Sequence, residues 1–189
     1  MPKQRITKEM VVNAAFEIAR TEGMEKVMVK TIAGKLGCSV QPIYSYCQNM
    51  DSLRKDVACR AGTYMQEYLK SHIDLDNLFQ STGRAYIQMA KEEPHIFKIY
   101  ISRERENITS LDDLYQTETN PKMAKIIAGH LHISEEEAKQ LHLHMLIYTI
   151  GIGTILSVTS SGISEKEIFH QQEQAYQAFF KFIQGGKQP

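Results

Sequence analysis

Residues 29–53 read VKTIAGKLGCSVQPIYSYCQNMDSL, and this stretch decides the fold of the N-terminal part of the chain. Apolar side chains recur at helical spacing before Gly37, which predicts a short helix ending there. These side chains are Val29, Ile32, Ala33 and Leu36. After a three-residue turn, we expect another short helix with Ser39 as its N-cap. Pro42 then falls in the first turn, where its missing N–H breaks no helical hydrogen bond.

A further helix is predicted upstream of this stretch. Thr7 is a favourable N-cap, apolar residues continue at i, i+4 spacing to about Thr21, and Gly23 can end the helix. Three helices, the last two joined by a short glycine-containing turn, match the helix-turn-helix plan, in which the third helix lies in the major groove of DNA.

The third helix of this plan has two chemically different faces. Val40, Ile43 and Cys47 are spaced i, i+3, i+7 and are expected to pack inward. The opposite face offers an amide for adenine edges, hydroxyls for phosphate and an apolar ring for a thymine methyl. The residues on that face are Gln41, Pro42, Tyr44 and Ser45.

Charge is distributed unevenly along the chain. Its 189 residues include 22 Lys and Arg and 22 Asp and Glu, so the net charge is zero. Residues 1–60 nevertheless carry a net charge of +4 and the remainder −4. Different charges in the two halves favour two different tasks. Basic side chains flank the predicted reading helix and can contact the DNA backbone, namely Lys3, Arg5, Lys30 and Lys35.

The run from Val29 to Leu53 resembles the DNA-binding signature of the TetR/AcrR transcriptional regulators. The matching positions are Ile32-Ala33, Leu36-Gly37, Ser39, Ile43-Tyr44 and Leu53, with Ala14-Ala15 and Gly23 in the first helix. The resemblance implies a helix-turn-helix DNA-binding domain over residues 1–48 and a helical ligand-binding and dimerisation domain over residues 49–189. It also implies a regulator, in most members a repressor, that binds a palindromic double-stranded DNA operator as a dimer and releases it when a small-molecule effector binds.

Three positions depart from the pattern of that family. Members often have Ser or Thr at the position of Met28, a His-Phe pair at Tyr46-Cys47 and a phosphate-contacting lysine at Met50. We therefore predict that Lys30, Tyr44 and Tyr46 make more of the phosphate contacts here. The complete set of predicted DNA-binding residues is Lys30, Ser39, Val40, Gln41, Pro42, Tyr44, Ser45 and Tyr46.

Helical periodicity continues to the C-terminus, and no β-alternating run of convincing length appears, so an all-α protein is predicted. A long helix capped by Asn49 or Asp51 is expected first, and a polar loop is expected before Asn120-Pro121. Further helices are predicted over residues 75–92, 95–104 and about 121–131. Capping boxes at Ser134 and Ser164 start two long closing helices.

The last two helices carry apolar stripes that predict a homodimer interface, with packing within one monomer as the alternative. The stripes are Leu141, Met145, Tyr148, Ile152 and Ile155 on one helix and Ile168, Ala175, Phe179, Phe182 and Ile183 on the other. A pocket for an effector is hypothesised among aromatic and methionine side chains, with ordinary core packing as the alternative. Its candidate residues are Phe79, Tyr86, Met89, Phe97, Tyr100, Tyr115, Met123 and Tyr148.

Several other functions are disfavoured by the sequence. No nucleophile–base spacing or nucleotide-binding motif is present, so we predict that the protein is not an enzyme and uses no cofactor. His142 and His144 point in different directions on a helix, which argues against a metal site. The cysteines Cys38, Cys47 and Cys59 are odd in number and favour a reducing cytoplasm over a disulfide framework.

The apolar run at residues 145–158 is shorter than a membrane span and predicts a buried helix, and no secretory signal is expected, so no membrane partner is predicted. The main alternative function is a helical protein-binding adaptor whose helix-turn-helix no longer reads DNA.

Overall fold

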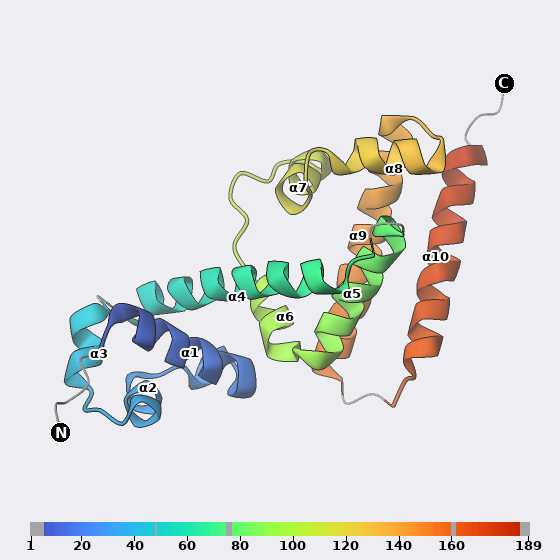
Figure 1. The fold of residues 1–189 in the computed structure, drawn as a ribbon. Coiled ribbons are helices and arrows are strands. Elements are labelled where there is room, and N and C mark those ends of the chain that lie inside the picture. Colours follow the sequence, from blue (N-terminus) through green and yellow to red (C-terminus); the bar gives the residue numbers. More distant parts are fainter. Residues whose placement is uncertain (1–5, 48, 75–76, 160–161, 186–189) are drawn as a thin grey trace. The chain divides into compact units, whose positions relative to one another are not determined.

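The computed structural model describes residues 6–47, 49–74, 77–159 and 162–185, and this part of the chain is helical without any β-strand (Figure 1). The prediction of an all-α protein is therefore confirmed. The α-helices are α1 Lys8–Glu22, α2 Val29–Leu36, α3 Gln41–Tyr46, α4 Met50–His72, α5 Leu78–Glu92, α6 Pro94–Ile101, α7 Leu111–Glu118, α8 Met123–Leu131, α9 Glu135–Val158 and α10 Glu165–Gly185, and the 3-10 helix η1 spans Met24–Lys26.

The helices pack into two compact units. The first comprises residues 1–71 and 89–103, and the second comprises residues 72–88 and 104–189. Helix α5 therefore begins in the second unit and ends in the first. The predicted boundary after residue 48 divides the chain by function instead of by packing, and it remains a prediction.

In the first unit, α1 packs on α2, α3 and α6. Its core is formed by fully buried side chains from every one of its larger helices, among them Val11, Ile32, Ile43, Val57 and Phe97. Gly37 ends α2 in the left-handed conformation, with φ 63°, which a residue with a side chain seldom adopts. This residue therefore allows α3 to follow α2 after a tight turn.

Two details of the predicted elements were wrong. Val40, and not Ser39, is the N-cap of α3, and it makes no side-chain capping hydrogen bond. The expected polar loop before Asn120 contains helix α7. The Ser110 hydroxyl accepts a hydrogen bond from the Asp113 N–H, and Tyr115 is buried, so a cap and one anchoring ring stabilise a short polar helix.

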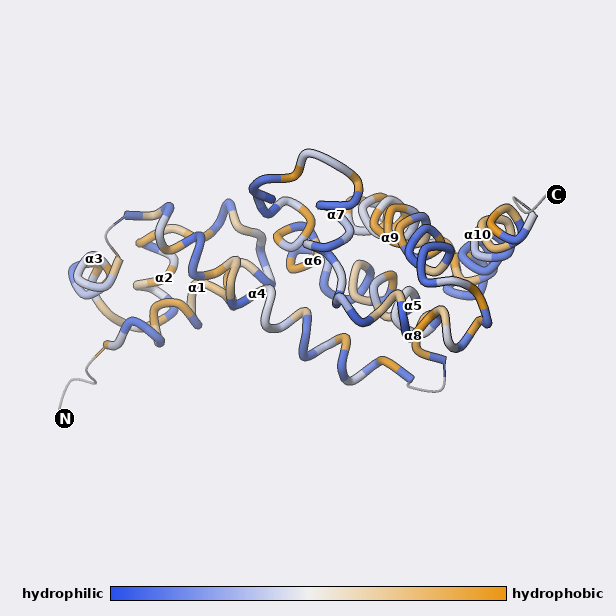
Figure 2. Tube along the Cα trace, turned by 90° about the horizontal axis from the view of Figure 1, so that it is seen from above, coloured by the Kyte–Doolittle hydropathy of each residue, from blue (hydrophilic) through white to orange (hydrophobic). Residues whose placement is uncertain are grey.

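In the second unit, α9 packs against both α8 and α10, and α9 and α10 lie side by side (Figure 1). Ser134 and Glu137 form the predicted capping box of α9, and the Ser164 hydroxyl accepts from the Glu167 N–H before α10. Figure 2 shows hydrophobic positions alternating with hydrophilic ones along the long helices, as expected of helices with one buried face.

Helix α9 is, among the described residues, the one helix long and apolar enough to cross a membrane by length and composition. Core helices that pack inside a protein pass the same test, and a third of the most apolar segment of α9 is buried in this chain. One face of the helix contributes Leu141 and Met145 to a cluster with Tyr176 and Ile183 of α10. The expected buried helix is thus buried on one side only.

The apolar stripes predicted for a dimer interface belong mainly to the core of the monomer. Leu141, Met145, Ile168 and Ile183 are buried within the second unit. Two members of the predicted stripes, Ile155 and Phe182, are exposed, and other exposed apolar or small residues recur at helical spacing with them. The exposed stripe consists of Ile147, Gly151, Ile155 and Val158 on α9 with Ala178 and Phe182 on α10. Periodicity shows that a helix has apolar faces, but only packing shows which face the neighbouring helices cover.

Candidate nucleic-acid interface and effector pocket

The short helix α3 separates its buried and exposed side chains nearly as predicted. Ile43 and Cys47 are buried, whereas Gln41 and Ser45 are exposed and the Tyr44 ring is 62% exposed. Pro42 and Tyr46 are half-buried. Val40 is 39% exposed, so the expectation that it packs inward was wrong, because it lies before the first helical turn. The exposed face therefore presents one amide and one phenol ring to solvent.

The surroundings of this face supply further polar groups. Lys30 and Lys35 on α2 and Ser39 in the turn are exposed, whereas Lys3 and Arg5 lie outside the described residues. The Ser45 hydroxyl donates to the Gln41 carbonyl oxygen over 3.2 Å, so it is partly engaged within α3.

Met28 lacks the oxygen of a capping side chain, and Thr31 takes over part of that role. The Thr31 hydroxyl accepts a hydrogen bond from the Met28 N–H over 3.1 Å and thereby fixes the start of α2.

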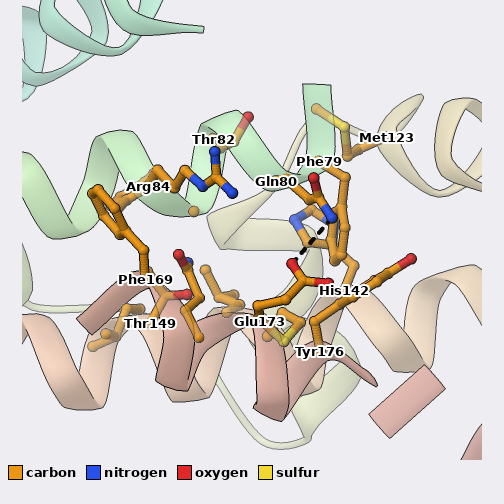
Figure 3. Close-up of a pocket in the computed structure, with 16 residues that line it drawn as sticks. Phe79, Gln80, Thr82, Arg84, Met123, His142, Thr149, Phe169, Glu173 and Tyr176 are labelled. Carbon is orange, nitrogen blue, oxygen red and sulfur yellow. Dashed lines mark hydrogen bonds between the residues drawn. The ribbon is translucent and has the colours of Figure 1, made fainter. Parts of the chain in front are cut away.

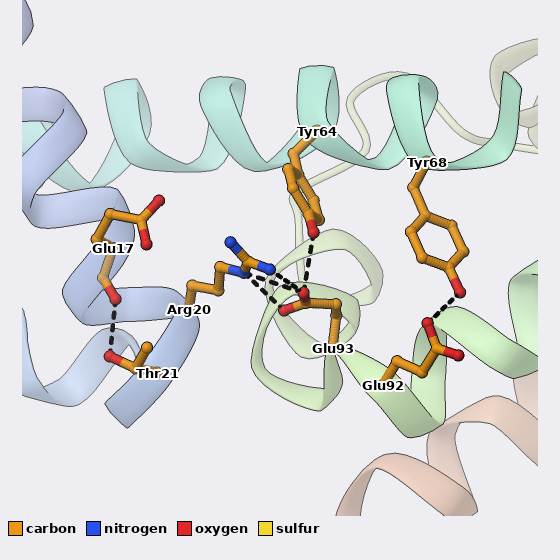
Figure 4. Close-up of polar contacts among 7 residues, drawn as sticks. All are labelled: Glu17, Arg20, Thr21, Tyr64, Tyr68, Glu92 and Glu93. Carbon is orange, nitrogen blue, oxygen red and sulfur yellow. Dashed lines mark hydrogen bonds and ion pairs between the residues drawn. The ribbon is translucent and has the colours of Figure 1, made fainter. Parts of the chain in front are cut away.

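A polar cluster inside the first unit joins α1, α4 and the start of α6 (Figure 4). The Arg20 Nε donates to both carboxylate oxygens of Glu93, at 3.0 and 2.9 Å, and Tyr64 donates to Oε1 of Glu93 over 2.9 Å. Arg20 also lies over the Tyr64 ring. Burial opposes ionisation of Glu93, but the hydrogen bonds from Arg20 and Tyr64 outweigh it and lower the pKa of the carboxyl group. The cluster therefore links α1 to α4 and to the start of α6, and α1 in turn packs against α2 and α3.

Replacing Glu93 with glutamine is expected to reduce the free energy of unfolding by about 2 kcal/mol at pH 7, the typical contribution of hydrogen bonds to a charged group. A lowered pKa stabilises the fold above the ordinary carboxyl value, and this contribution is lost as the pH falls through the folded pKa. The difference between wild type and variant should therefore shrink below about pH 4. Chemical denaturation at several pH values measures it, with the exposed Glu67→Gln as control.

The second unit contains a pocket between α5, α9 and α10 with a cavity volume of about 60 Å³, and the pocket is partly open to solvent. Figure 3 shows Phe79, Gln80 and Arg84 of α5 facing side chains of the two long helices, with a hydrogen bond from Gln80 to Glu173 across the pocket. Most of the wall is apolar or aromatic, a composition typical of small-molecule sites. The apolar lining includes Phe79, Tyr86, Met123, Met145, Leu146, Ile150, Phe169 and Tyr176.

Three of the eight predicted effector-binding residues, Phe79, Tyr86 and Met123, line this pocket. Tyr115 and Tyr148 lie close to it, the former bonded to the pocket residue His142 and the latter packed on the cluster around Leu141. The other three belong to the first unit. They are Met89 and Phe97, which are fully buried there, and Tyr100, whose ring lies under Arg103.

The polar residues of the pocket were not among those predicted from the sequence. Gln80, Thr82, Arg84, His142, Thr149, Gln172 and Glu173 all contribute to the lining. A polar residue on an otherwise apolar helix face is the signal that would have indicated Thr149 and Gln172, since an uncompensated polar group is costly to bury.

His142 is held neutral at the edge of the pocket. Its Nδ1 lies 3.0 Å from the Tyr115 hydroxyl, and its ring packs edge-on against Tyr115 and Phe79. Burial lowers the pKa of His142 to about 4. A neutral imidazole carries a proton on one ring nitrogen and a lone pair on the other, so His142 offers one hydrogen-bond donor and one acceptor in this region.

The free energy of unfolding is expected to fall by about 2 kcal/mol between pH 7 and pH 4.5 because of His142. Unfolding releases this histidine to its ordinary pKa, so the unfolded chain binds more protons in that interval. The variant His142→Asn should lose that part of the pH dependence, whereas replacement of the exposed His170 by asparagine should retain it. Identical pH profiles for wild type and His142→Asn would contradict the assignment.

The geometry of the described residues disfavours two alternative chemistries, metal binding and thiol reactivity. Among the described residues, no group of three His, Cys, Asp or Glu side chains lies close enough together to hold a metal ion. The three cysteines are free thiols, and burial raises the pKa of Cys47, which favours the unreactive thiol form. Cys47 therefore acts as a small core side chain beneath α3.

Comparisons with solved structures place this arrangement of helices among known folds. A TetR-family transcriptional regulator from Haemophilus influenzae RD aligns over 90% of this chain and 94% of its own, with a TM-score of 0.56 and 16% identity. A transcriptional regulator from Rhodococcus sp. RHA1 aligns over 94% and 97%, with a TM-score of 0.61 and 13% identity. The chain has the fold of the TetR-family regulators.

The match found by sequence comparison covers a smaller part of the chain than the structural matches do. No protein-family model matches the chain. The HTH-type transcriptional regulator YobS of Bacillus subtilis strain 168 is 23% identical over 113 residues, which make up 58% of this chain and 59% of that protein. The fold that residues 29–53 predicted through their resemblance to the TetR signature is therefore confirmed. These similar proteins are named as transcriptional regulators.

Proposed function

We propose that this protein is a cytoplasmic transcription regulator that binds a palindromic DNA operator as a homodimer, acts as a repressor and releases the operator when a small molecule fills the pocket of the second unit. The observation that carries the proposal is the two-faced helix α3. Its buried face, Ile43 and Cys47, anchors it to the core, and its exposed face offers Gln41 and Tyr44. In a helix-turn-helix this is the face that enters the major groove.

The proposed contacts divide into base readers and phosphate binders. The Gln41 amide can form two hydrogen bonds with adenine, and the exposed Tyr44 can contact a neighbouring base with its ring and a phosphate with its hydroxyl. Lys30, Ser39, Ser45 and Tyr46 are assigned to phosphates, and Val40 and Pro42 to apolar contact with the groove. Together they are the eight residues predicted to bind DNA.

The dimer is assigned to the exposed stripe on α9 and α10. Ile155 is 61% exposed and Phe182 71% exposed, and solvent-exposed apolar side chains gathered in one stripe mark an interface. A two-fold dimer presents two copies of α3 to half-sites one helical turn apart, which a palindromic operator provides. Gly151 lies in the stripe and has no atom within 4 Å of the position of a Cβ, so a partner helix can approach closely there.

The effector would act by differential affinity. In one state of the dimer, the two copies of α3 no longer fit successive major grooves. A ligand that binds this state more tightly shifts the population towards it and thereby lowers the affinity for DNA.

Selection of binding sites from random duplex DNA, at two salt concentrations, tests the proposal. A recovered palindrome with half-sites about one turn apart supports it. Weak binding without enrichment that disappears at the higher salt concentration contradicts it, and favours instead a protein-binding adaptor. The neutral net charge and Met50, at the position of a family lysine, are the features that make this alternative worth testing.

Replacing Lys30 with alanine should weaken binding to every DNA sequence to a similar extent. Lys30 is exposed, and a lysine on a phosphate contributes electrostatic affinity through release of counterions. The slope of log affinity against log salt should fall by about 1 for each protomer bound. Fluorescence anisotropy with the selected duplex and a scrambled duplex measures both effects, and the exposed Lys166→Ala on α10 serves as control. A loss confined to the selected duplex would assign Lys30 to base recognition instead.

A further inference from the structure

Two buried polar side chains face the pocket without a partner. Gln172 on α10 is 6% exposed and Thr149 on α9 is 5% exposed, and both line the pocket. Neither side chain makes a hydrogen bond to another residue in the part of the chain that the structure describes. Their polar atoms remain accessible from the pocket, because His144 Nδ1 is the one fully buried side-chain nitrogen or oxygen without a partner among the described residues. An unpaired amide and an unpaired hydroxyl together are therefore a candidate recognition site.

Gly83 on α5 creates the space that these groups occupy. A Cβ at residue 83 would lie 2.4 Å from Nε2 of Gln172 and 3.8 Å from Oγ1 of Thr149. Both polar groups therefore lie beside the same point on the backbone of α5. The glycine lets the amide approach that helix more closely than any side chain would allow.

The charged residues of the pocket balance each other. The Glu173 carboxylate accepts hydrogen bonds from Gln80 over 3.2 Å and from Gln177 over 2.8 Å. Arg84 is exposed and lies over the Phe169 ring, 5.6 Å from its centre. His142 is neutral near pH 7, so one cation and one anion remain and the lining has no net charge. A charged ligand attracted by one of these residues would be repelled by the other.

We propose that the pocket binds an uncharged, mainly aromatic or aliphatic molecule whose polar group both donates and accepts hydrogen bonds, such as a carboxamide, and that Gln172 and Thr149 recognise this group. An amide and a hydroxyl each offer a donor and an acceptor, which is the complement of such a group. The aromatic and methionine walls hold the apolar body. The inference rests on the proposed effector pocket and specifies the chemistry of its ligand.

Matched naphthalene derivatives test the proposal on the full-length protein without DNA. The probes are 2-naphthamide, 2-naphthoate, 2-naphthylmethylammonium and 2-methylnaphthalene, and anisotropy of naphthalene fluorescence reports binding. The chain contains no tryptophan, so naphthalene emission is easily separated from that of the protein. We expect the dissociation constant of the amide to be at least about tenfold lower than those of the other three probes, the usual effect of satisfying buried polar groups.

Two variants test whether the Gln172 side chain causes the preference for the amide probe. Gln172→Met removes the amide at similar length, and Gly83→Ala displaces it by adding a Cβ where its nitrogen lies. Both should abolish the advantage of the amide over 2-methylnaphthalene, whereas Gln174→Met, an exposed position on the same helix outside the pocket lining, should leave it unchanged. Circular dichroism confirms that each variant is folded, and the second variant keeps the test valid if the first is not.

Several results would overturn the proposal. These are no measurable binding of any probe, equal affinity for the amide and the hydrocarbon, or tighter binding of either charged probe. Affinity for the selected operator, measured on the same samples, separates this inference from the proposed function. Operator binding without a preference for the amide rejects only the ligand chemistry. A preference for the amide without DNA binding rejects the regulator.

Discussion

Replacing Phe182 with glutamate is expected to convert the proposed dimer to a monomer and to lower the affinity for the operator at least about 100-fold. The Phe182 ring is 71% exposed in the single chain, so the substitution leaves the monomer core intact. In a dimer the same position would bury a carboxylate without a partner, a penalty of several kcal/mol. A monomer then binds with one reading helix and loses the gain from simultaneous contact with two half-sites. Analytical ultracentrifugation and anisotropy with the operator measure the two effects.

The same substitution at Leu111 is a matched control for this experiment. Leu111 is 60% exposed but belongs to α7, so it is not a member of the exposed stripe on α9 and α10. Leu111→Glu should remain dimeric and bind DNA normally, and Ile155→Glu on α9 should reproduce the effect of Phe182→Glu. A dimer that persists in both stripe variants would place the interface elsewhere.

Replacing Gln41 with alanine should lower affinity for the selected operator by about 10- to 100-fold and leave binding to unrelated DNA almost unchanged. A bidentate amide–adenine pair contributes about 1–3 kcal/mol of discrimination for each base read. Because Gln41 is exposed and lies in the first turn of α3, its loss should not disturb the core beneath Ile43. Repeating the binding-site selection with the variant should show relaxed choice at one position in each half-site.

The comparison with Lys30→Ala makes this prediction specific. The lysine variant should weaken all duplexes alike and reduce the salt dependence, whereas the glutamine variant should change sequence choice and keep the salt dependence. Equal losses on selected and unrelated DNA for Gln41→Ala would contradict its role as a base reader. In that event Tyr44, the most exposed ring of α3, is the next position to replace.

Local signals in the sequence located most helix ends correctly. Thr7 caps α1, Gly37 ends α2 in the left-handed conformation, and Ser134 forms its capping box before α9. Each of these signals acts within four or five residues, so it can be recognised without knowledge of the fold. The errors at Ser39 and in the expected loop before Asn120 concern short helices, where one turn of hydrogen bonds competes closely with other local structures.

The candidate pocket was only partly predictable for a different reason. Aromatic and methionine residues are common both in cores and in binding sites, so composition selected Phe79, which lines the pocket, but also Phe97, which is fully buried in the other unit. The residues proposed to give the pocket its specificity are Thr149 and Gln172. Their role depends on the absence of a side chain at Gly83, which lies on a different helix.

The sequence by itself determined that the chain is helical, that residues 29–47 form two short helices with a tight turn, and that Ile43 and Cys47 face inward while Gln41 and Tyr44 face solvent. Periodicity, caps and glycine conformation act over one or two helical turns, so they can be recognised from the amino-acid sequence alone. Only the tertiary structure decided which stripe of α9 and α10 is covered, which polar side chains line a pocket, and that Arg20 meets Glu93. These features join residues far apart in sequence, and the packing of the helices alone brings them together.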